Sequence, residues 1–215
     1  MIYLISGLGA DERVFQKLNF GKHATTYLPW IIPEENETMQ DYLRRFSGQI
    51  NKEEEVILIG VSFGGLIAIE LSKMIEVKKI ILISSIKTHN EFSLLLKFLK
   101  LTKIYKLFPA TRFKKRFRFL SHYYFGSKTP EERKSLNELI DDSDTRIMDW
   151  SVLTFFNWKN EQAPENLYHI HGTHDKIFPS RYLRNTIPVK QATHFMIANR
   201  AEEVSEIIQY ILDKN

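Results

Sequence analysis

The chain has 215 residues, a length that suits one domain carrying an insertion. Hydrophobic residues make up 43% of the sequence and charged residues 26%, values close to the globular average, which excludes disordered and fibrous classes. The sequence contains no cysteine, so disulfide scaffolds, thiolate metal sites and cysteine nucleophiles are excluded.

The formal net charge of +4 is unevenly distributed. Residues 87–118 contain ten basic residues and one acid, a local charge of +9, so the rest of the chain sums to −5. The simplest interpretation is a solvated helical surface. The alternatives are contact with an anionic membrane surface or steering of an anionic substrate. No nucleic-acid recognition motif accompanies the charge, so nucleic-acid binding is not expected.

The amino-terminal stretch Met1–Gly7 is apolar but short, and it lacks the basic residues that begin a signal peptide. It predicts a buried strand. No apolar run is long enough to span a membrane, and the expected location is the cytoplasm.

Short apolar runs rich in β-branched residues alternate with helical patterns along the chain. The expected strands are Ile2–Ser6, Ala24–Leu28, Val56–Ile59, Lys79–Ser84, Leu167–His171 and Ile187–Gln191.

Helix starts are predicted from capping residues and apolar periodicity. The expected caps are Thr38, Thr129 before Pro130, and Asn199 paired with Glu202. A further helix is expected to begin near Asp144. The expected helices without a clear cap are a segment starting near Asp11, Leu66–Met74, Phe92–Phe108 and Pro179–Thr186.

Strands that alternate with helices of this length predict an α/β fold with a mainly parallel central sheet and helices on both faces. No strand pattern appears between residues 87 and 163. We therefore expect residues 1–86 and 164–215 to form the core and residues 87–163 to form an inserted helical lid at one end of the sheet.

The strongest motif is Gly60-Val61-Ser62-Phe63-Gly64, which stands where a predicted strand turns into a predicted helix. A sharp turn of this kind exposes the serine hydroxyl, and glycines on both sides avoid clashes. A serine hydroxyl needs a base to accept its proton and an acid to orient that base.

Asp175 and His194 each lie in a loop that follows a predicted strand. With Ser62 they fall at the carboxyl edge of the sheet, where open α/β sheets bind ligands. His171 and His174 are the competing histidines. His171 ends a strand and is expected to be a packing residue, and His174 adjoins Asp175 too closely to be oriented by it.

The order Ser62, Asp175, His194 resembles that of the α/β-hydrolase fold superfamily, and the resemblance covers nearly the whole chain outside the lid. Ser6-Gly7-Leu8-Gly9 is similar to the family's His-Gly-x-Gly oxyanion loop, with serine in place of the leading histidine. The resemblance implies that the backbone N–H groups of Leu8 and Phe63 form the oxyanion hole.

The chain also begins at what would be the family's third strand. Ala24–Leu28 is therefore expected to be an edge strand, and an exposed edge would allow a homodimer. The sequence does not determine the oligomeric state.

Three further residues are candidates for lining the substrate site: Gly9, Trp158 and His174. The remaining histidines show no metal-ligand spacing, so no metal and no cofactor are expected.

These features predict a serine hydrolase that acts on a small-molecule acyl substrate, with a carboxylic ester as the first choice. Two alternatives remain at this point. One is a thioesterase or acyltransferase that uses the same three residues, and the other is a non-catalytic homologue that binds a membrane or a protein.

Overall fold

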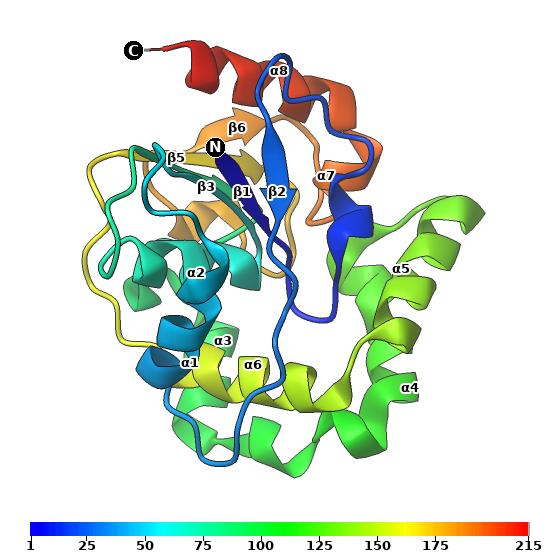
Figure 1. Ribbon diagram of the computed structural model, residues 1–215. Helices are drawn as coiled ribbons and strands as arrows, with labels where there is room; N and C mark the ends of the chain where they lie inside the picture. Colours follow the sequence, from blue (N-terminus) through cyan, green and yellow to red (C-terminus); the bar gives the residue numbers. More distant parts are fainter. Residues whose placement is uncertain (215) are drawn as a thin grey trace.

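The computed structural model describes residues 1–214, apart from the side chains of Thr111, Phe113 and Arg116. It consists of six parallel strands flanked by helices (Figure 1). The strands are β1 (Ile2–Ile5), β2 (Thr25–Tyr27), β3 (Ile57–Val61), β4 (Lys79–Ile83), β5 (Leu167–Gly172) and β6 (Ile187–Val189). Their order in the sheet is β2-β1-β3-β4-β5-β6, and every neighbouring pair is parallel. The expected sheet is confirmed, and β2 is an edge strand as predicted.

Alternate residues of the central strands pack into two separate hydrophobic clusters, one on each face of the sheet. In β1, Tyr3 and Ile5 point into the first cluster, whereas Ile2 and Leu4 point into the second. Because both faces of the sheet are covered, the central strands are apolar almost throughout.

Helices cover both faces of this sheet. α1 (Met39–Phe46) and α2 (Phe63–Leu71) contribute to the first cluster. α7 (Met196–Asn199) and α8 (Ala201–Asp213) contribute to the second, and α8 lies at the end of the molecule opposite α3 and α4 (Figure 1).

Residues 87–163, between β4 and β5, contain no strand and are called the helical segment below. Its helices lie at the end of the sheet toward which β1 runs (Figure 1). They are α3 (Leu94–Thr102), α4 (Ala110–Ser121), α5 (Pro130–Asp142) and α6 (Thr145–Asn157).

Two predicted helix caps, Thr38 and Thr129, are confirmed, and a helix begins next to Asp144 as expected. The side chains of Thr38, Thr129 and Asp144 each accept a hydrogen bond from a backbone N–H in the first turn of α1, α5 and α6. These hydrogen bonds satisfy amide groups that have no partner within the helix.

Other boundaries differ from the prediction. The helix expected over Phe92–Phe108 stops at Thr102, because Lys103 adopts a left-handed conformation with φ of 55° and caps α3. Asn199 ends α7 and does not cap α8, whose first turn follows Arg200. Pro179–Thr186 contains only a single 3₁₀ turn, Ser180–Tyr182, and the helix expected from Asp11 is likewise a 3₁₀ turn, Glu12–Phe15.

Within residues 1–214, none of the helices combines the length and apolar character needed to cross a lipid bilayer.

Candidate active site

Ser62 lies between the end of β3 and the first residue of α2. Its backbone has φ of 51° and ψ of −117°, a conformation that non-glycine residues adopt only when the surrounding structure enforces it. The strand and helix are both buried, so the turn between them has no freedom to relax.

Glycine is required on both sides of this turn by close backbone contacts. A Cβ on Gly60 would lie 2.4 Å from the carbonyl oxygen of Gly64, and a Cβ on Gly64 would lie 2.3 Å from that of Ile5. Atoms cannot approach so closely, so the sharp turn depends on these two residues.

His194 follows β6 and contacts the other two predicted residues. Its Nε2 lies 3.0 Å from Oγ of Ser62, and its Nδ1 lies 2.7 Å from Oδ2 of Asp175. The imidazole packs edge-on against the rings of Phe125 and Phe178. The structure therefore brings Ser62, His194 and Asp175 into one hydrogen-bonded chain.

Asp175 is buried, and both of its carboxylate oxygens accept hydrogen bonds. Oδ2 contacts His194, and Oδ1 accepts from the backbone N–H groups of Ile177 and Phe178 at 2.8 and 2.9 Å. Burial alone would raise the pKa of Asp175, but the charge and hydrogen bond of His194 outweigh it. The pKa therefore lies below its ordinary value, and the carboxylate stays ionised at neutral pH.

The competing histidines occupy other positions. His171 is buried, and its Nε2 lies 2.8 Å from the carbonyl oxygen of Phe178, the packing role predicted for it. His174 is exposed and lies in a surface depression outside the cavity of Ser62. Within residues 1–214, no cluster of three carboxylate or imidazole side chains is arranged to hold a metal ion.

The loop that contains Leu8 is held next to Ser62. A Cβ on Gly7 would lie 3.3 Å from Cβ of Ser62, so the two loops are in contact. In the part of the chain that the structure describes, neither the Leu8 N–H nor the Phe63 N–H has a hydrogen-bond acceptor. Both residues line the cavity that contains the Ser62 hydroxyl.

Ser6 supports this loop in a way that the sequence did not reveal. Its buried hydroxyl donates to the carbonyl oxygen of Ala10 at 2.8 Å and accepts from Nε1 of Trp30 at 2.9 Å. The hydroxyl of Tyr27 lies 3.1 Å away. Serine at the position of the family's histidine therefore still fixes the loop, through two aromatic partners that no local pattern singled out.

The cavity at Ser62 has a volume of about 390 Å³ and is lined mainly by apolar side chains. Leu95, Leu96 and Leu99 of α3 and Phe117 and Leu120 of α4 form part of its wall. Lys176 is the one lysine, arginine or acidic residue among the described residues that line it. The site is therefore suited to an uncharged, apolar group.

A second apolar cavity of about 690 Å³ adjoins the first and shares Leu8, Phe117 and Leu120 with it. Its other walls include Ala110 of α4 and Val152 of α6. The two cavities together extend from Ser62 beneath the helical segment.

Of the three candidate substrate contacts, only Gly9 lines the cavity at Ser62. Trp158 is a correction to the prediction: it is buried, and its Nε1 donates to Oε1 of Glu70 at 2.7 Å, outside this cavity. His174 also lies outside it, as described above. Phe155, one turn before Trp158, lines the cavity instead.

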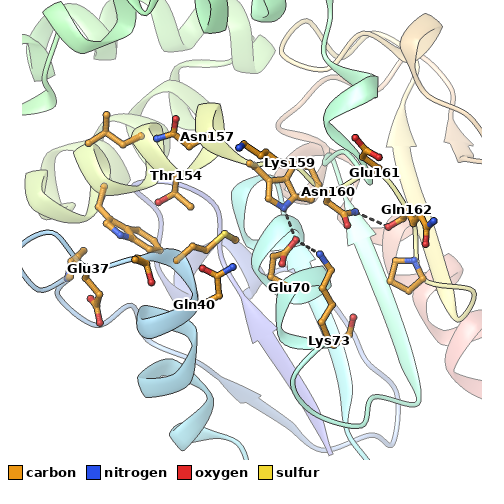
Figure 2. Close-up of a pocket in the computed structure, with 18 of the residues that line it drawn as sticks. Glu37, Gln40, Glu70, Lys73, Thr154, Asn157, Lys159, Asn160, Glu161 and Gln162 are labelled. Carbon is orange, nitrogen blue, oxygen red and sulfur yellow. Dashed lines mark hydrogen bonds and ion pairs between the residues drawn. The ribbon is translucent and has the colours of Figure 1, made fainter.

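A larger hollow than the cavity at Ser62 lies elsewhere, between α1, α2 and the loop that follows α6 (Figure 2). In this groove of about 1420 Å³, Glu70 accepts from Trp158 and pairs with Lys73 at 2.6 Å. Neither Ser62 nor His194 lines this groove. Size alone therefore does not identify the reactive site.

The comparisons with known proteins agree with this fold. The model of an uncharacterised protein family, UPF0227, matches residues 8–98, which is less than half of the chain. A search of curated proteins finds no match.

Solved structures match over nearly the full length at low sequence identity. A hydrolase from Oleispira antarctica has a TM-score of 0.72 and 14% identity, covering 99% of this chain and 91% of its own. A bromoperoxidase from Bacillus anthracis has a TM-score of 0.68 and 17% identity, with the same two coverages. An esterase from Exiguobacterium antarcticum has a TM-score of 0.66 and 15% identity, again covering 99% and 91%. The parallel sheet, the turn at Ser62 and these likenesses show that the chain has the α/β-hydrolase fold.

Proposed function

We propose that the protein is a serine hydrolase that cleaves carboxylic esters with an apolar acyl group through an acyl-enzyme intermediate. The observation that carries this proposal is the position of His194, whose two ring nitrogens lie 3.0 Å from the Ser62 hydroxyl and 2.7 Å from the Asp175 carboxylate. This is the arrangement that a hydroxyl nucleophile needs in order to lose its proton.

In the first half of the reaction, Oγ of Ser62 attacks the ester carbonyl carbon while Nε2 of His194 takes the hydroxyl proton. Asp175 keeps the Nδ1 proton of His194 directed toward itself and stabilises the imidazolium. The carbonyl oxygen becomes an oxyanion, which the N–H groups of Leu8 and Phe63 are placed to receive. Loss of one such donor typically costs about 10²–10³ in rate.

Collapse of this intermediate breaks the bond to the leaving alcohol, and His194 returns its proton to the alcohol oxygen. The acyl group is then esterified to Ser62. In the second half, His194 accepts a proton from water, which attacks the acyl carbon, and then protonates Ser62 Oγ as the acid leaves.

The apolar cavities support an acyl group as the part of the substrate that is bound. Burying apolar surface contributes about 25 cal/mol per Å², so a hydrocarbon chain gains binding free energy along walls such as Leu96, Leu99 and Phe155. Among the described residues, no acidic side chain lines the cavity at Ser62, so a cationic substrate would have no partner there. The one acid in the wall of the adjoining cavity is Asp149, whose Oδ1 accepts a hydrogen bond from the backbone N–H of Ala110.

A fluorophosphonate probe tests the nucleophile. It should label the wild-type protein and should not label Ser62→Ala. Ser121→Ala is the matched control, because Ser121 lines the same cavity but its hydroxyl donates to the carbonyl oxygen of Arg118. Equal labelling of wild type and Ser62→Ala would overturn the proposal.

A substrate panel separates the proposal from its alternatives. We expect turnover of p-nitrophenyl esters to exceed that of acyl-CoA thioesters. Faster turnover of the thioesters would identify a thioesterase, and acyl transfer to an added alcohol in preference to water would identify an acyltransferase. No turnover by a correctly folded protein would favour a non-catalytic homologue.

A further inference from the structure

Helices α3 and α4 of the helical segment expose large apolar side chains that are not covered by any other part of the described chain. Leu101 is 82% exposed and Phe119 is 78% exposed. Single exposed leucines are ordinary, but several large apolar side chains left exposed on two helices that border the same cavity indicate an interaction surface. We call six of these exposed residues the apolar face: Leu94, Phe98 and Leu101 of α3, Leu107 of the 3₁₀ turn between the two helices, and Phe119 and Leu120 of α4.

In α3 the spacing shows that one side of the helix is left without a protein partner. Leu94, Phe98 and Leu101 recur at i, i+4 and i+7 and therefore share one side, and all three are exposed. Leu96 and Leu99 instead pack against the core cluster, and both line the cavity. The helix is thus apolar toward the protein and also toward solvent.

The apolar face is accompanied by cations. Lys97, Lys103 and Lys115 are exposed, and among residues 1–214 none of them forms an ion pair with an acid. The one acid within residues 87–118 is Glu91, which is buried and pairs with Lys87. The segment therefore presents uncompensated positive charge beside exposed leucine and phenylalanine.

The cavity at Ser62 reaches this same surface. Leu95, Phe117 and Leu120 line the cavity and are also exposed, so they stand at its rim. Leu95 belongs to α3, whereas Phe117 and Leu120 belong to α4, and the two helices therefore border the rim from two sides. An object that covers the apolar face would lie over an opening that leads to the serine hydroxyl.

We propose that the apolar face docks on the surface of a membrane that contains anionic lipids. Amphipathic helices bind such surfaces by burying leucine and phenylalanine at the acyl boundary while lysine contacts anionic headgroups. The two observed features, apolar side chains without a protein partner and lysines without acids, match the two layers of that surface. Docking would present the rim of the cavity to the lipid, so that apolar esters enter from the membrane.

This proposal does not depend on the proposed activity, because binding requires neither Ser62 nor His194. The test is flotation of the purified full-length chain with vesicles of equimolar phosphatidylcholine and phosphatidylglycerol, compared with vesicles of phosphatidylcholine alone. Wild type and Ser62→Ala should bind the anionic vesicles equally, and at least about tenfold better than the neutral ones.

Two pairs of variants, each with a matched control, test the contact of lysine with the headgroups and the burial of apolar side chains at the acyl boundary. Lys97→Glu/Lys103→Glu/Lys115→Glu should lose at least about tenfold in binding. Its control, Lys17→Glu/Lys22→Glu/Lys52→Glu, changes the net charge equally, from +4 to −2 because each substitution subtracts 2, and should bind as wild type.

Leu101→Ser/Phe119→Ser should lose binding to a similar extent. Its control, Ile32→Ser/Met74→Ser, removes two exposed apolar residues outside the helical segment and should bind as wild type. None of the substituted residues in either pair lines the cavity at Ser62, so hydrolysis of a short soluble ester should stay unchanged in all four variants.

Three results would overturn the proposal: no vesicle binding by the wild type, equal binding to neutral and anionic vesicles, or unchanged binding in both test variants. A dimer in sedimentation that Leu101→Ser/Phe119→Ser dissociates, without vesicle binding, would assign the apolar face to a second copy of the chain. Absence of ester hydrolysis with vesicle binding intact would contradict the proposed function alone.

Discussion

Nδ1 of His194 lies 2.7 Å from Oδ2 of Asp175, and both side chains are almost completely shielded from solvent. At this depth the carboxylate depends on its hydrogen bonds, two of which come from the backbone of the loop that follows it. Because these hydrogen bonds fix the carboxylate, Asp175 holds the imidazole of His194 in the orientation that faces Ser62.

Asp175→Asn should lower kcat for ester hydrolysis by about 10⁴-fold, because an amide can donate to Nδ1 and favour the wrong tautomer. The side-chain oxygen of asparagine can still accept the hydrogen bonds from the N–H groups of Ile177 and Phe178, so the variant should fold. The measurement is kcat together with the melting temperature. Asp141→Asn, at an exposed residue, is the control, and activity within about tenfold of wild type in Asp175→Asn would contradict the assigned role.

Gly64→Ala should destabilise the fold severely, because its Cβ would lie 2.3 Å from the carbonyl oxygens of Ile5 and Ser6. A loss of about 3 kcal/mol or more in the free energy of unfolding is expected, measured by urea denaturation. Gly48→Ala is the control, since no atom lies within 4 Å of its added Cβ, and it should change stability by less than about 1 kcal/mol. Equal stability of the two variants would show that the turn at Ser62 can relax.

His169 should make the folded state sensitive to acid. It is buried in β5, where only 1% of its surface is exposed. Burial, followed by the charges of His171 and Lys87, lowers the pKa of His169 well below its usual value. Below pH 6.5, its ordinary pKa, the unfolded chain binds a proton that the folded chain does not, so stability falls as the pH falls.

His169→Leu should therefore flatten the pH dependence of unfolding. This one group accounts for at most about 1.4 kcal/mol per pH unit, and the measurement is urea denaturation between about pH 7.5 and about pH 5. His171, whose pKa burial also lowers, remains in the variant and keeps part of the dependence. His174→Gln alters an exposed histidine as the control. An identical slope in wild type and His169→Leu would refute the prediction.

The cavity that adjoins the site should accept the far end of a long acyl chain. Ala110→Trp would place an indole among its walls, and turnover of long p-nitrophenyl esters should fall by about tenfold or more while short esters are cleaved as before. Ala163→Trp, in the separate groove of Figure 2, should leave both rates unchanged. A parallel loss on short and long esters in Ala110→Trp would mean that the cavity does not bind the chain.

Several features were determined by the sequence itself. Apolar runs of strand length alternating with helical patterns predicted a parallel sheet. The predicted caps at Thr38 and Thr129 act through hydrogen bonds within a few residues. Parallel strands end at one edge, so Ser62, Asp175 and His194 could be assigned to that edge without knowledge of any distance. A feature could be predicted from the sequence where it depends on residues close together in the chain or on the direction of the strands.

Tertiary packing decided the rest. Helical periodicity shows that Trp158 and Phe155 are candidates for burial, but only the packing of α6 sends Trp158 to Glu70 and Phe155 to the cavity. Ser6 reaches Tyr27 and Trp30, more than twenty residues away, through contacts that leave no pattern in the chain. The exposure of Leu101 follows for the same reason: whether an apolar side of a helix is covered depends on what else folds against it, and that is a property of the whole molecule.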